Sequence, residues 1–457
     1  MGEIEHLVVL ALENRSFDHL IGSLRAQDHR IDGPMGTGFN YADPKTQTGK
    51  FLVTFDAPYV PDVNPGPGHE FPNALNQIFL ASAVPNPIVP DKCNLGFAFD
   101  YRQVCLSSGQ TDEESRANAG AVLRCFGAQK LPALHTLARE FAICNKWFSS
   151  IPGPTWPNRF FMHCATSGGY VDNALRAYPM RTLFQNLSDA NVSWRVYYHD
   201  VPQSLALQNQ RQYFSTKYEL YDQAFVRDCH NGLLPQYSFI EPRYSNEGAS
   251  RANDQHPIHG VPLGDALIAN IYEAVRASPN WETTMLLIIW DEHGGFYDHA
   301  IPTRTVNPDG APSDFDFTVL GARVPAIVIS PRVPRATVDI DTVYDHSSIC
   351  ASAKELFALP QFLTRRDAQA NTFLKLASLV SPRTDTPTSL PSLGAEAQAT
   401  PADSPATELH TSLTKMAESL TDPSAGERPE PATEQESGAR IRAAMDAYRQ
   451  RTGPAPA

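Results

Sequence analysis

The feature that most constrains the fold is an unbroken apolar run, residues 283–290, that ends directly on Asp291 and Glu292. A run of this length without polar alternation predicts a strand buried on both faces, as in a parallel sheet covered by helices. Adjacent carboxylates at the end of such a strand are costly unless something neutralises them. In open α/β sheets, ligands bind at the carboxyl ends of the strands. The sequence therefore predicts a ligand site at this position.

A second junction near the start of the chain repeats the pattern. The apolar run 7–12 leads straight into Glu13 and Asn14. The two strand ends together offer Glu13, Asn14, Asp291 and Glu292, all of which carry hard oxygen donors. Such a set suits a hard or borderline divalent cation better than a cation that seeks thiolates.

Size and composition set the classes of protein that the chain can belong to. Its 457 residues, of which 42% are hydrophobic, allow one large α/β domain or two to three average domains. The 37 basic and 50 acidic residues give a net charge of −13, and no basic block appears. This balance argues against a nucleic-acid partner, which requires concentrated positive charge. No apolar stretch approaches the length of a membrane span, so we expect no transmembrane segment. The oligomeric state is left open.

Strand and helix patterns alternate up to about residue 381. Their order predicts an α/β fold with helices on both faces of a sheet, in a single domain spanning residues 1–381. Leu267, Ile268, Ile271 and Val275 share one face of an expected helix. The clearest strands are expected at 7–12, 194–198, 285–290 and 324–330, and helices at 131–139, 265–277 and 347–356.

Residues 382–457 form a segment of different composition, rich in Pro, Ala, Ser, Thr and Glu. Such composition offers little apolar surface to bury, so we expect a polar tail. Two short amphipathic pieces interrupt it, Leu409 to Leu420 and Ala439 to Arg449. The second could dock on the body or on a partner, but we expect a solvated tail helix.

The cysteines and the start of the chain bear on localisation. The seven cysteines show no CxxC spacing, which argues against a zinc cage or a thioredoxin-type motif. An odd count without a visible signal peptide favours reduced thiols and the cytoplasm if the chain is complete. A removed leader would leave the same sequence, so a secreted or periplasmic location stays open.

Four longer motifs identify the chain by resemblance. They are residues 13–19 (ENRSFDH), residues 153–159 (GPTWPNR), Asp254-Gln255-His256-Pro257, and residues 291–299 (DEHGGFYDH). In this order they resemble the bacterial phosphoesterase family that includes phosphatidylcholine-cleaving phospholipases C and acid phosphatases, with plant non-specific phospholipases C as relatives. The resemblance spans about residues 1–360. It implies an alkaline-phosphatase-like α/β/α sandwich with a largely parallel central sheet.

The resemblance also implies roles for individual residues. Thr155 is expected as the nucleophile, and His69, Asp254 and His256 are expected to line the phosphate site. His199 resembles a further family histidine through a looser local motif. One divalent ion (Ca, Mg, Mn or Zn) is expected to be held by Glu13, Asn14, Thr155, Asp291 and Glu292.

The chemistry of such a site is coherent without the family. A threonine hydroxyl is a weak nucleophile unless a base or a metal activates it. A phosphothreonine would form and then be hydrolysed, with His256, positioned by Asp254, protonating the leaving alkoxide and His69 holding a non-bridging oxygen. The expected substrate is a phospholipid or a small phosphate ester. Two other residues have two possible roles each. Arg159 either binds a phosphate or holds neighbouring carbonyl groups, and His346 either belongs to the site or caps a helix.

Three functions follow from these observations. The first is a metal-dependent phosphodiesterase of the phospholipase C type. The second is an acid phosphatase-type phosphomonoesterase with the same nucleophile and metal. The third is a non-catalytic binding protein on the same fold, against which the complete set of expected ligands argues.

Overall fold

The computed structural model describes residues 4–59, 62–246, 250–257, 259–309, 315–393 and 404–453. Its main sheet has eight strands in the order β10-β4-β9-β8-β1-β7-β5-β6. All neighbouring strands are parallel except β9, which runs antiparallel to β4 and β8. The strands are β1 His6–Leu12, β4 Ala142–Cys144, β5 Trp194–Tyr198, β6 Tyr218–Leu220, β7 Tyr237–Glu241, β8 Thr284–Trp290, β9 Ala326–Ile329 and β10 Thr337–Asp339.

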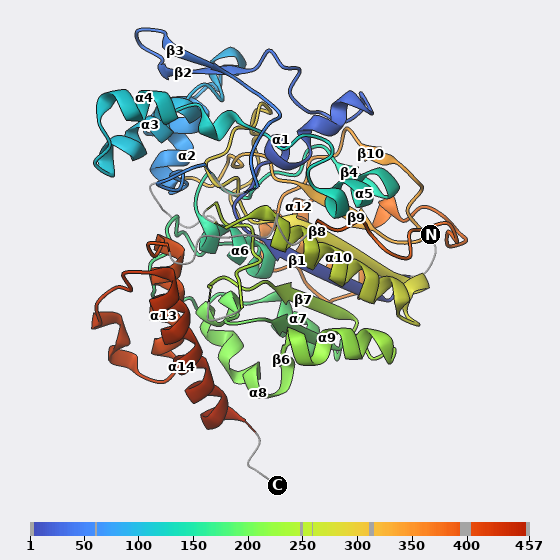
Figure 1. Ribbon diagram of the computed structural model, residues 1–457. Helices are drawn as coiled ribbons and strands as arrows, with labels where there is room; N and C mark the ends of the chain where they lie inside the picture. The colour runs from blue at the N-terminus through green and yellow to red at the C-terminus, as the bar shows by residue number, and fades with distance from the viewer. Residues whose placement is uncertain are drawn as a thin grey trace.

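Helices cover both faces of this sheet. Successive side chains of a strand point to opposite faces, and on β5 the Trp194 ring contacts Phe184 of α7 whereas the Tyr197 ring contacts Phe225 of α9. Helix α10 lies in front of the central strands in Figure 1. The helices of the body are α1 Phe17–Leu20, α2 Phe71–Phe79, α3 Phe97–Ser107, α4 Asp112–Asn118, α5 Pro132–Glu140, α6 Thr155–Cys164, α7 Leu183–Asp189, α8 Phe214–Lys217, α9 Tyr221–His230, α10 Val261–Ala277, α11 Ser347–Leu356 and α12 Arg365–Gln369. The predicted α/β architecture with a largely parallel sheet is confirmed.

The central strands β1 and β8 are fully buried along their whole length. Their unbroken apolar sequence leaves no polar face for solvent, which places them in the middle of the sheet. A small hairpin, β2 Phe39–Asp43 with β3 Thr48–Leu52, packs with α3 in the upper lobe of Figure 1. Among the described residues, no helix combines the length and apolar character needed to cross a membrane.

The C-terminal helices pack on the body, so the expected solvated tail helix is wrong. Helices α13 Glu408–Ser419 and α14 Glu434–Thr452 form a hairpin at the lower left of Figure 1. Leu413, Met416, Ile441 and Met445 are at most 1% exposed and belong to the same hydrophobic core as the central strands. The domain boundary at residue 381 stays a prediction, and residues 394–403 and 454–457 of the expected tail lie outside the described residues.

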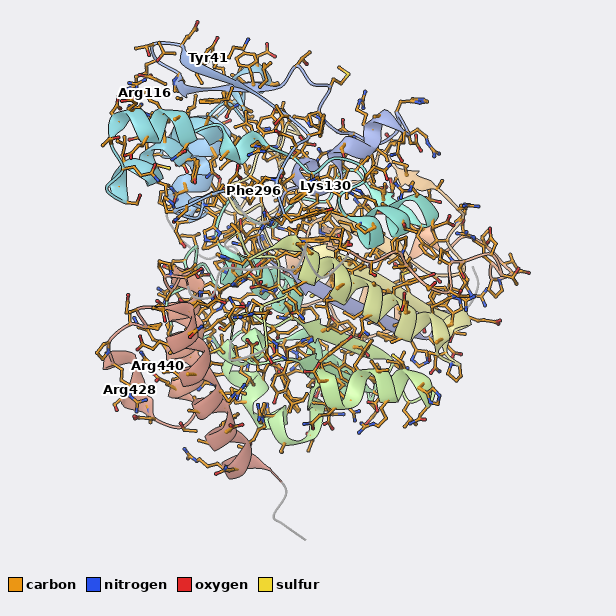
Figure 2. The ribbon with its side chains drawn as sticks, in the orientation of Figure 1. Tyr41, Arg116, Lys130, Phe296, Arg428 and Arg440 are labelled. Carbon is orange, nitrogen blue, oxygen red and sulfur yellow. The ribbon has the colours of Figure 1, made fainter. Side chains whose placement is uncertain are left out.

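Salt bridges hold the C-terminal hairpin together. Arg428 and Arg440, both labelled in Figure 2, lie 3.3 and 3.0 Å from the Glu418 carboxylate of α13. Arg440 follows in α14, so the Glu418 contact joins the two helices directly. Salt bridges therefore join the two helices of the hairpin, and buried apolar side chains pack the hairpin against the body.

Candidate active site

The two strand ends singled out in the sequence lie side by side. Strands β1 and β8 pair in parallel with Leu12 opposite Trp290, so Glu13 and Asp291 leave the sheet at the same level. The backbone N–H of Asn14 donates to Asp291 Oδ1 at 2.9 Å. The four expected ligands at these strand ends are all fully buried: Glu13, Asn14, Asp291 and Glu292.

Two glycines allow the neighbouring loops to approach these acids. Gly294 has φ +66°, and a Cβ there would lie 2.1 Å from the carbonyl oxygen of Asn14. Gly295 has φ +75°, and a Cβ there would lie 2.6 Å from the carbonyl oxygen of Gly68. Side chains at either position would be strained and would push the loops apart. The two glycines after Asp291-Glu292 thus bring the Asn14 and His69 loops into the site.

Thr155 is the first residue of α6 and is held by a stiff turn. Asn158, one turn later, accepts from the backbone N–H of Ile151 and donates to the carbonyl oxygens of Gly153 and Pro154. The fully buried Thr155 hydroxyl donates to Glu13 Oε2 at 3.2 Å. The expected nucleophile and the expected ligand Glu13 are therefore in direct contact.

Arg159 supplies positive charge to the buried acids. Its guanidinium donates to Glu13 Oε1 at 2.6 Å and to the carbonyl oxygen of Ala11 at 3.1 Å, and its Nε lies 3.5 Å from Asp291 Oδ2. Burial and the nearby Asp291 nevertheless raise the pKa of Glu13, and burial raises the pKa of Asp291. Arg159 thus holds both acids and the end of β1 through hydrogen bonds and ion pairs. A second positive charge would stabilise the ionised forms of the acids further.

His69 lies on the other side of the acids. Its Nδ1 contacts the side-chain amide of Asn14 and lies 2.8 Å from Glu292 Oε1. Burial opposes a charge on either group, but their attraction outweighs it. The pKa of His69 is raised to about 9 and that of Glu292 is lowered to about 2.

Asp254 and His256 reach the site, but Asp254 does not bind the imidazole that the sequence suggested. Its carboxylate accepts from the backbone N–H of His256 at 3.2 Å and from Nδ1 of His259 at 2.6 Å. The His256 ring lies 5.8 Å from the His69 ring, and neither of its nitrogens has a hydrogen-bond partner among the described residues. Burial and the nearby His69 lower the pKa of His256 well below its usual value. The sequence reasoning missed His259, which lies two residues after the motif that ends at Pro257.

His199 contacts the end of β7 and has no direct contact with Thr155 among the described residues. It follows β5, its Nδ1 donates to the Glu241 carbonyl oxygen at 2.9 Å, and its ring stacks on Tyr221. It lines a separate cavity of about 380 Å³ with Asp222 and Arg243, among others. Burial lowers the pKa of His199 to about 4. In the described structure no hydrogen bond or ion pair joins it directly to Thr155 or to an expected metal ligand, and its assignment to the phosphate site stays a prediction.

Two further histidines support the strand end after β8. His346 Nε2 donates to the Asp291 carbonyl oxygen at 2.5 Å, and its Nδ1 accepts from the Trp147 indole at 3.3 Å. His346 therefore contacts the site through the Asp291 backbone, and its side chain does not cap α11. His293 Nδ1 lies 3.3 Å from Glu292 Oε2 while its Nε2 binds Gln77.

The residues present fit a divalent cation. Asn14 Oδ1 and Asp291 Oδ2 are buried oxygens without a hydrogen-bond partner among the described residues. Carboxylate and amide oxygens of this kind are the ligands that hard cations prefer. The raised pKa values of Glu13 and Asp291 add a second indication, because a bound cation would favour their charged forms.

Comparisons with known proteins settle the family. The model of the Phosphoesterase family matches residues 4–360. The chain belongs to this family. It is a hydrolase of phosphoric esters, and the resemblance read from the motifs is confirmed.

Relatives of this phosphoesterase include plant and mycobacterial proteins. It is 39% identical over 410 residues to non-specific phospholipase C6 from Arabidopsis thaliana, covering 85% of this chain and 75% of the relative. It is 36% identical over 414 residues to non-specific phospholipase C3 from the same plant, covering 85% and 76%. Phospholipase C B from Mycobacterium tuberculosis is 27% identical over 413 residues, covering 79% and 74%.

The solved structures to which the phosphoesterase is similar include a protein of the alkaline phosphatase superfamily. This protein is from Vibrio parahaemolyticus, with a TM-score of 0.32, 11% identity, and coverage of 71% of this chain and 83% of that one. Another is the lipoteichoic acid synthase LtaP from Listeria monocytogenes, with a TM-score of 0.34, 10% identity, and coverage of 73% and 87%. At these TM-scores, no residue role is transferred from either protein.

Proposed function

We propose that this phosphoesterase is a metal-dependent phosphodiesterase of the phospholipase C type that works through a phosphothreonine at Thr155. The observation that carries the proposal is the Thr155 hydroxyl donating to the buried Glu13 at the rim where Asp291 also emerges. The names of the plant and mycobacterial relatives support a phospholipid as the substrate.

The residues of the site divide the work of two displacement steps. Thr155 Oγ attacks the phosphorus, its proton passes to Glu13 Oε2, and the P–O bond to the alcohol breaks. Water then gives a proton to His256 and attacks the phosphorus, the P–O bond to Thr155 breaks, and the proton held by Glu13 returns to the threonine oxygen as the phosphate product leaves. A divalent cation held by Glu13, Asn14, Thr155, Asp291 and Glu292 would lower the pKa of the hydroxyl and neutralise charge on the phosphoryl oxygens.

Two histidines complete the proposed chemistry. His69, with a pKa raised to about 9, carries a positive charge that suits a non-bridging phosphoryl oxygen. His256 has both ring nitrogens without a partner among the described residues, which leaves them available to the leaving alcohol. Because the pKa of His256 is lowered in the absence of substrate, its protonation requires the negative charge of a bound phosphate ester.

An activity screen tests the substrate class. A choline-type chromogenic phosphodiester and an aryl monophosphate are compared, each with added Ca, Mg, Mn or Zn. Preferential release of chromophore from the diester supports the phospholipase C-type assignment. Preference for the monoester assigns the acid phosphatase-type alternative, and no turnover of either ester or of phospholipid vesicles contradicts both.

The nucleophile is tested separately by Thr155→Ala, with Thr155→Ser as the matched control. Alanine removes the attacking oxygen, and we expect turnover to fall by about 10³-fold or more with the fold unchanged. Serine retains the oxygen and is expected to keep measurable activity. Mass spectrometry of acid-quenched wild-type enzyme should find on Thr155 the phosphoryl group with the second ester substituent of the diester still attached, which is phosphocholine for a choline-type substrate. Wild-type turnover in Thr155→Ala would rule out the covalent route.

A further inference from the structure

The C-terminal hairpin reaches into the site through one carboxylate. Glu434 is the first residue of α14 and is fully buried. Its Oε1 accepts from the backbone N–H of Asn246 at 2.6 Å and lies 3.0 Å from His259 Nε2. A carboxylate from the far end of the chain thus contacts the loop that carries Asp254 and His256.

His259 connects Glu434 to Asp254. Its Nδ1 lies 2.6 Å from Asp254 Oδ1, while its Nε2 faces Glu434. Both ring nitrogens face carboxylate oxygens, so both donate and the ring is an imidazolium. Burial opposes this charge, but the two carboxylates outweigh it and raise the pKa of His259 to about 10.

Asp254, which His259 holds in place, makes hydrogen bonds to two parts of the site. Its carbonyl oxygen accepts from the backbone N–H of Glu13 at 2.9 Å. Its carboxylate accepts from the backbone N–H of His256 at 3.2 Å. Because the His256 ring itself has no hydrogen-bond partner among the described residues, its position depends on this backbone.

The strain of the loop shows why an anchor is needed. Gln255, between Asp254 and His256, has φ +73°, a conformation that costs a non-glycine residue free energy. Such a conformation persists only where surrounding contacts hold it. The Asp254 carboxylate is one of these contacts, and Glu434 and His259 fix its direction.

A metal site built from the same residues is a weaker reading. Ligand atoms of His259, His410 and Glu434 lie within 4.8 Å of one another. However, His410 Nδ1 lies 3.1 Å from the Thr407 backbone N–H, and its Nε2 lies 3.0 Å from the Tyr244 carbonyl oxygen. Both nitrogens of His259 are likewise engaged with carboxylates. The hydrogen-bond network therefore already occupies the histidine nitrogens that a metal would need.

We infer that Glu434 is a positioning residue of the active site, which acts through His259 and Asp254 to hold the loop bearing His256. The C-terminal hairpin then contributes to the geometry of the active site of this phosphoesterase. The role of His256 toward the leaving alcohol rests on the proposed function, whereas the positioning of its ring does not.

Substitutions at Glu434 test the inference. Glu434→Ala removes both hydrogen bonds, and Glu434→Gln keeps one acceptor oxygen while removing the charge. Glu436→Gln is the control, because Glu436 lies in the same turn but is exposed. We expect kcat to fall by about 10- to 100-fold in Glu434→Ala with KM within about twofold of the wild-type value, because a displaced group affects the chemical step. Glu434→Gln should recover part of the loss, and the control should match the wild type.

A second readout does not depend on turnover. In NMR spectra of the protein with ring-labelled histidines, Glu434→Ala should shift the His256 signal and lose the doubly protonated His259 signal. The His256 signal is assigned with His256→Asn. Unchanged His256 signals in Glu434→Ala would overturn the inference whatever the activity. If Glu434→Ala does not fold, the same spectra are recorded for Glu434→Gln, and its His256 signal tests the inference. A wild-type protein that is inactive on every ester contradicts only the proposed function.

Discussion

Asp291 illustrates how one carboxylate serves both structure and proposed chemistry. Its Oδ1 accepts from the backbone N–H groups of Asn14 and Glu292, at 2.9 and 2.8 Å. In Asp291→Asn the amide keeps an oxygen for these bonds but loses the charge that a cation would bind. We expect the fold to persist, metal content by elemental analysis to fall, and turnover to drop by about 10²-fold or more.

Asp265→Asn is the matched control for that substitution. Asp265 is also a buried carboxylate that accepts from two backbone N–H groups, those of Ala133 and Leu134, but it lies on α10 outside the site. We expect its metal content and turnover per folded molecule to match the wild type. Equal metal content in Asp291→Asn and the wild type would contradict the ligand assignment.

His299, within the same nine-residue motif, is expected to control stability and not turnover. Its Nδ1 lies 2.7 Å from Asp18 Oδ2 and its Nε2 lies 3.2 Å from Asp32 Oδ1, beside the buried Arg323. Burial opposes the imidazolium, but the carboxylates outweigh it and raise the pKa of His299 to about 10. A raised folded-state pKa contributes stability that is fully present below the unfolded value of about 6.5 and lost as pH rises through about 10.

The pH dependence of unfolding measures this contribution. We expect the free energy of unfolding of the wild type to fall from about pH 6.5 to about pH 10. His299→Asn cannot lose a proton there, so its urea-unfolding free energy should fall less over the same range. Parallel pH dependences of the two proteins would show that His299 is not charged in the folded state.

At the residue scale, the sequence predicted which residues meet but not how all of them pair. Glu13, Asn14, Asp291 and Thr155 meet because each follows or begins a regular element at one rim of the sheet. Asp254 binds the His259 ring and not the His256 ring, because the backbone turn at Gln255 sets where each ring points. Sequence spacing carries no information on such a turn.

At the scale of elements, the site depends on the close approach of the loops after β1 and β8. In Gly294→Ala a Cβ would lie 2.1 Å from the Asn14 carbonyl oxygen. We expect the loop to shift by enough to lower turnover by about 10²-fold, because such displacements misplace reacting groups. The measurement is kcat for the preferred ester, together with the melting temperature.

Gly36→Ala is the control for Gly294→Ala. Gly36 has φ +69°, close to the +66° of Gly294, but a Cβ there would meet nothing within 4 Å. Both alanines are expected to cost about 1 kcal/mol of stability from the backbone conformation. Only Gly294→Ala should also lose activity. Equal activity of the two variants would show that the approach of the loops is not required.

The strands and helices differed in how well the sequence revealed them. Uniformly apolar runs located β1 and β8 to within a residue, and helical periodicity located α11. Strand β7 was missed although it lies fully buried between β1 and β5. Its sequence contains Ser238 and Glu241, and the latter is satisfied by Ser204 and Tyr244, which lie outside the strand. A polar residue whose hydrogen-bond partners lie outside its strand can be buried, but it interrupts the apolar run by which a buried strand is recognised in a sequence.

At the scale of the whole molecule, the C-terminal hairpin and the sheet share one hydrophobic core. The average composition of residues 382–457 concealed this, because a few apolar residues spaced along α13 and α14 are sufficient to cover the body. Met416 and Met445 are fully buried within a segment that is rich in polar residues. Composition measures how much apolar surface a segment has, whereas docking depends on where that surface lies.

Substitution in the hairpin should therefore destabilise the entire protein. Met445→Ala removes a fully buried side chain from the shared core, and we expect the free energy of unfolding to fall by about 2–5 kcal/mol in a single transition. Val380→Ala, at a side chain 81% exposed, is the control and should change it by less than about 0.5 kcal/mol.

Urea unfolding is followed by tryptophan fluorescence, which reports on the body because all five tryptophans precede residue 382, and by far-UV circular dichroism. Coincident curves that shift together would show one cooperative unit. A separate early transition in circular dichroism that alone responds to Met445→Ala would mean that the hairpin folds independently, and the boundary at residue 381 would then be a true domain boundary.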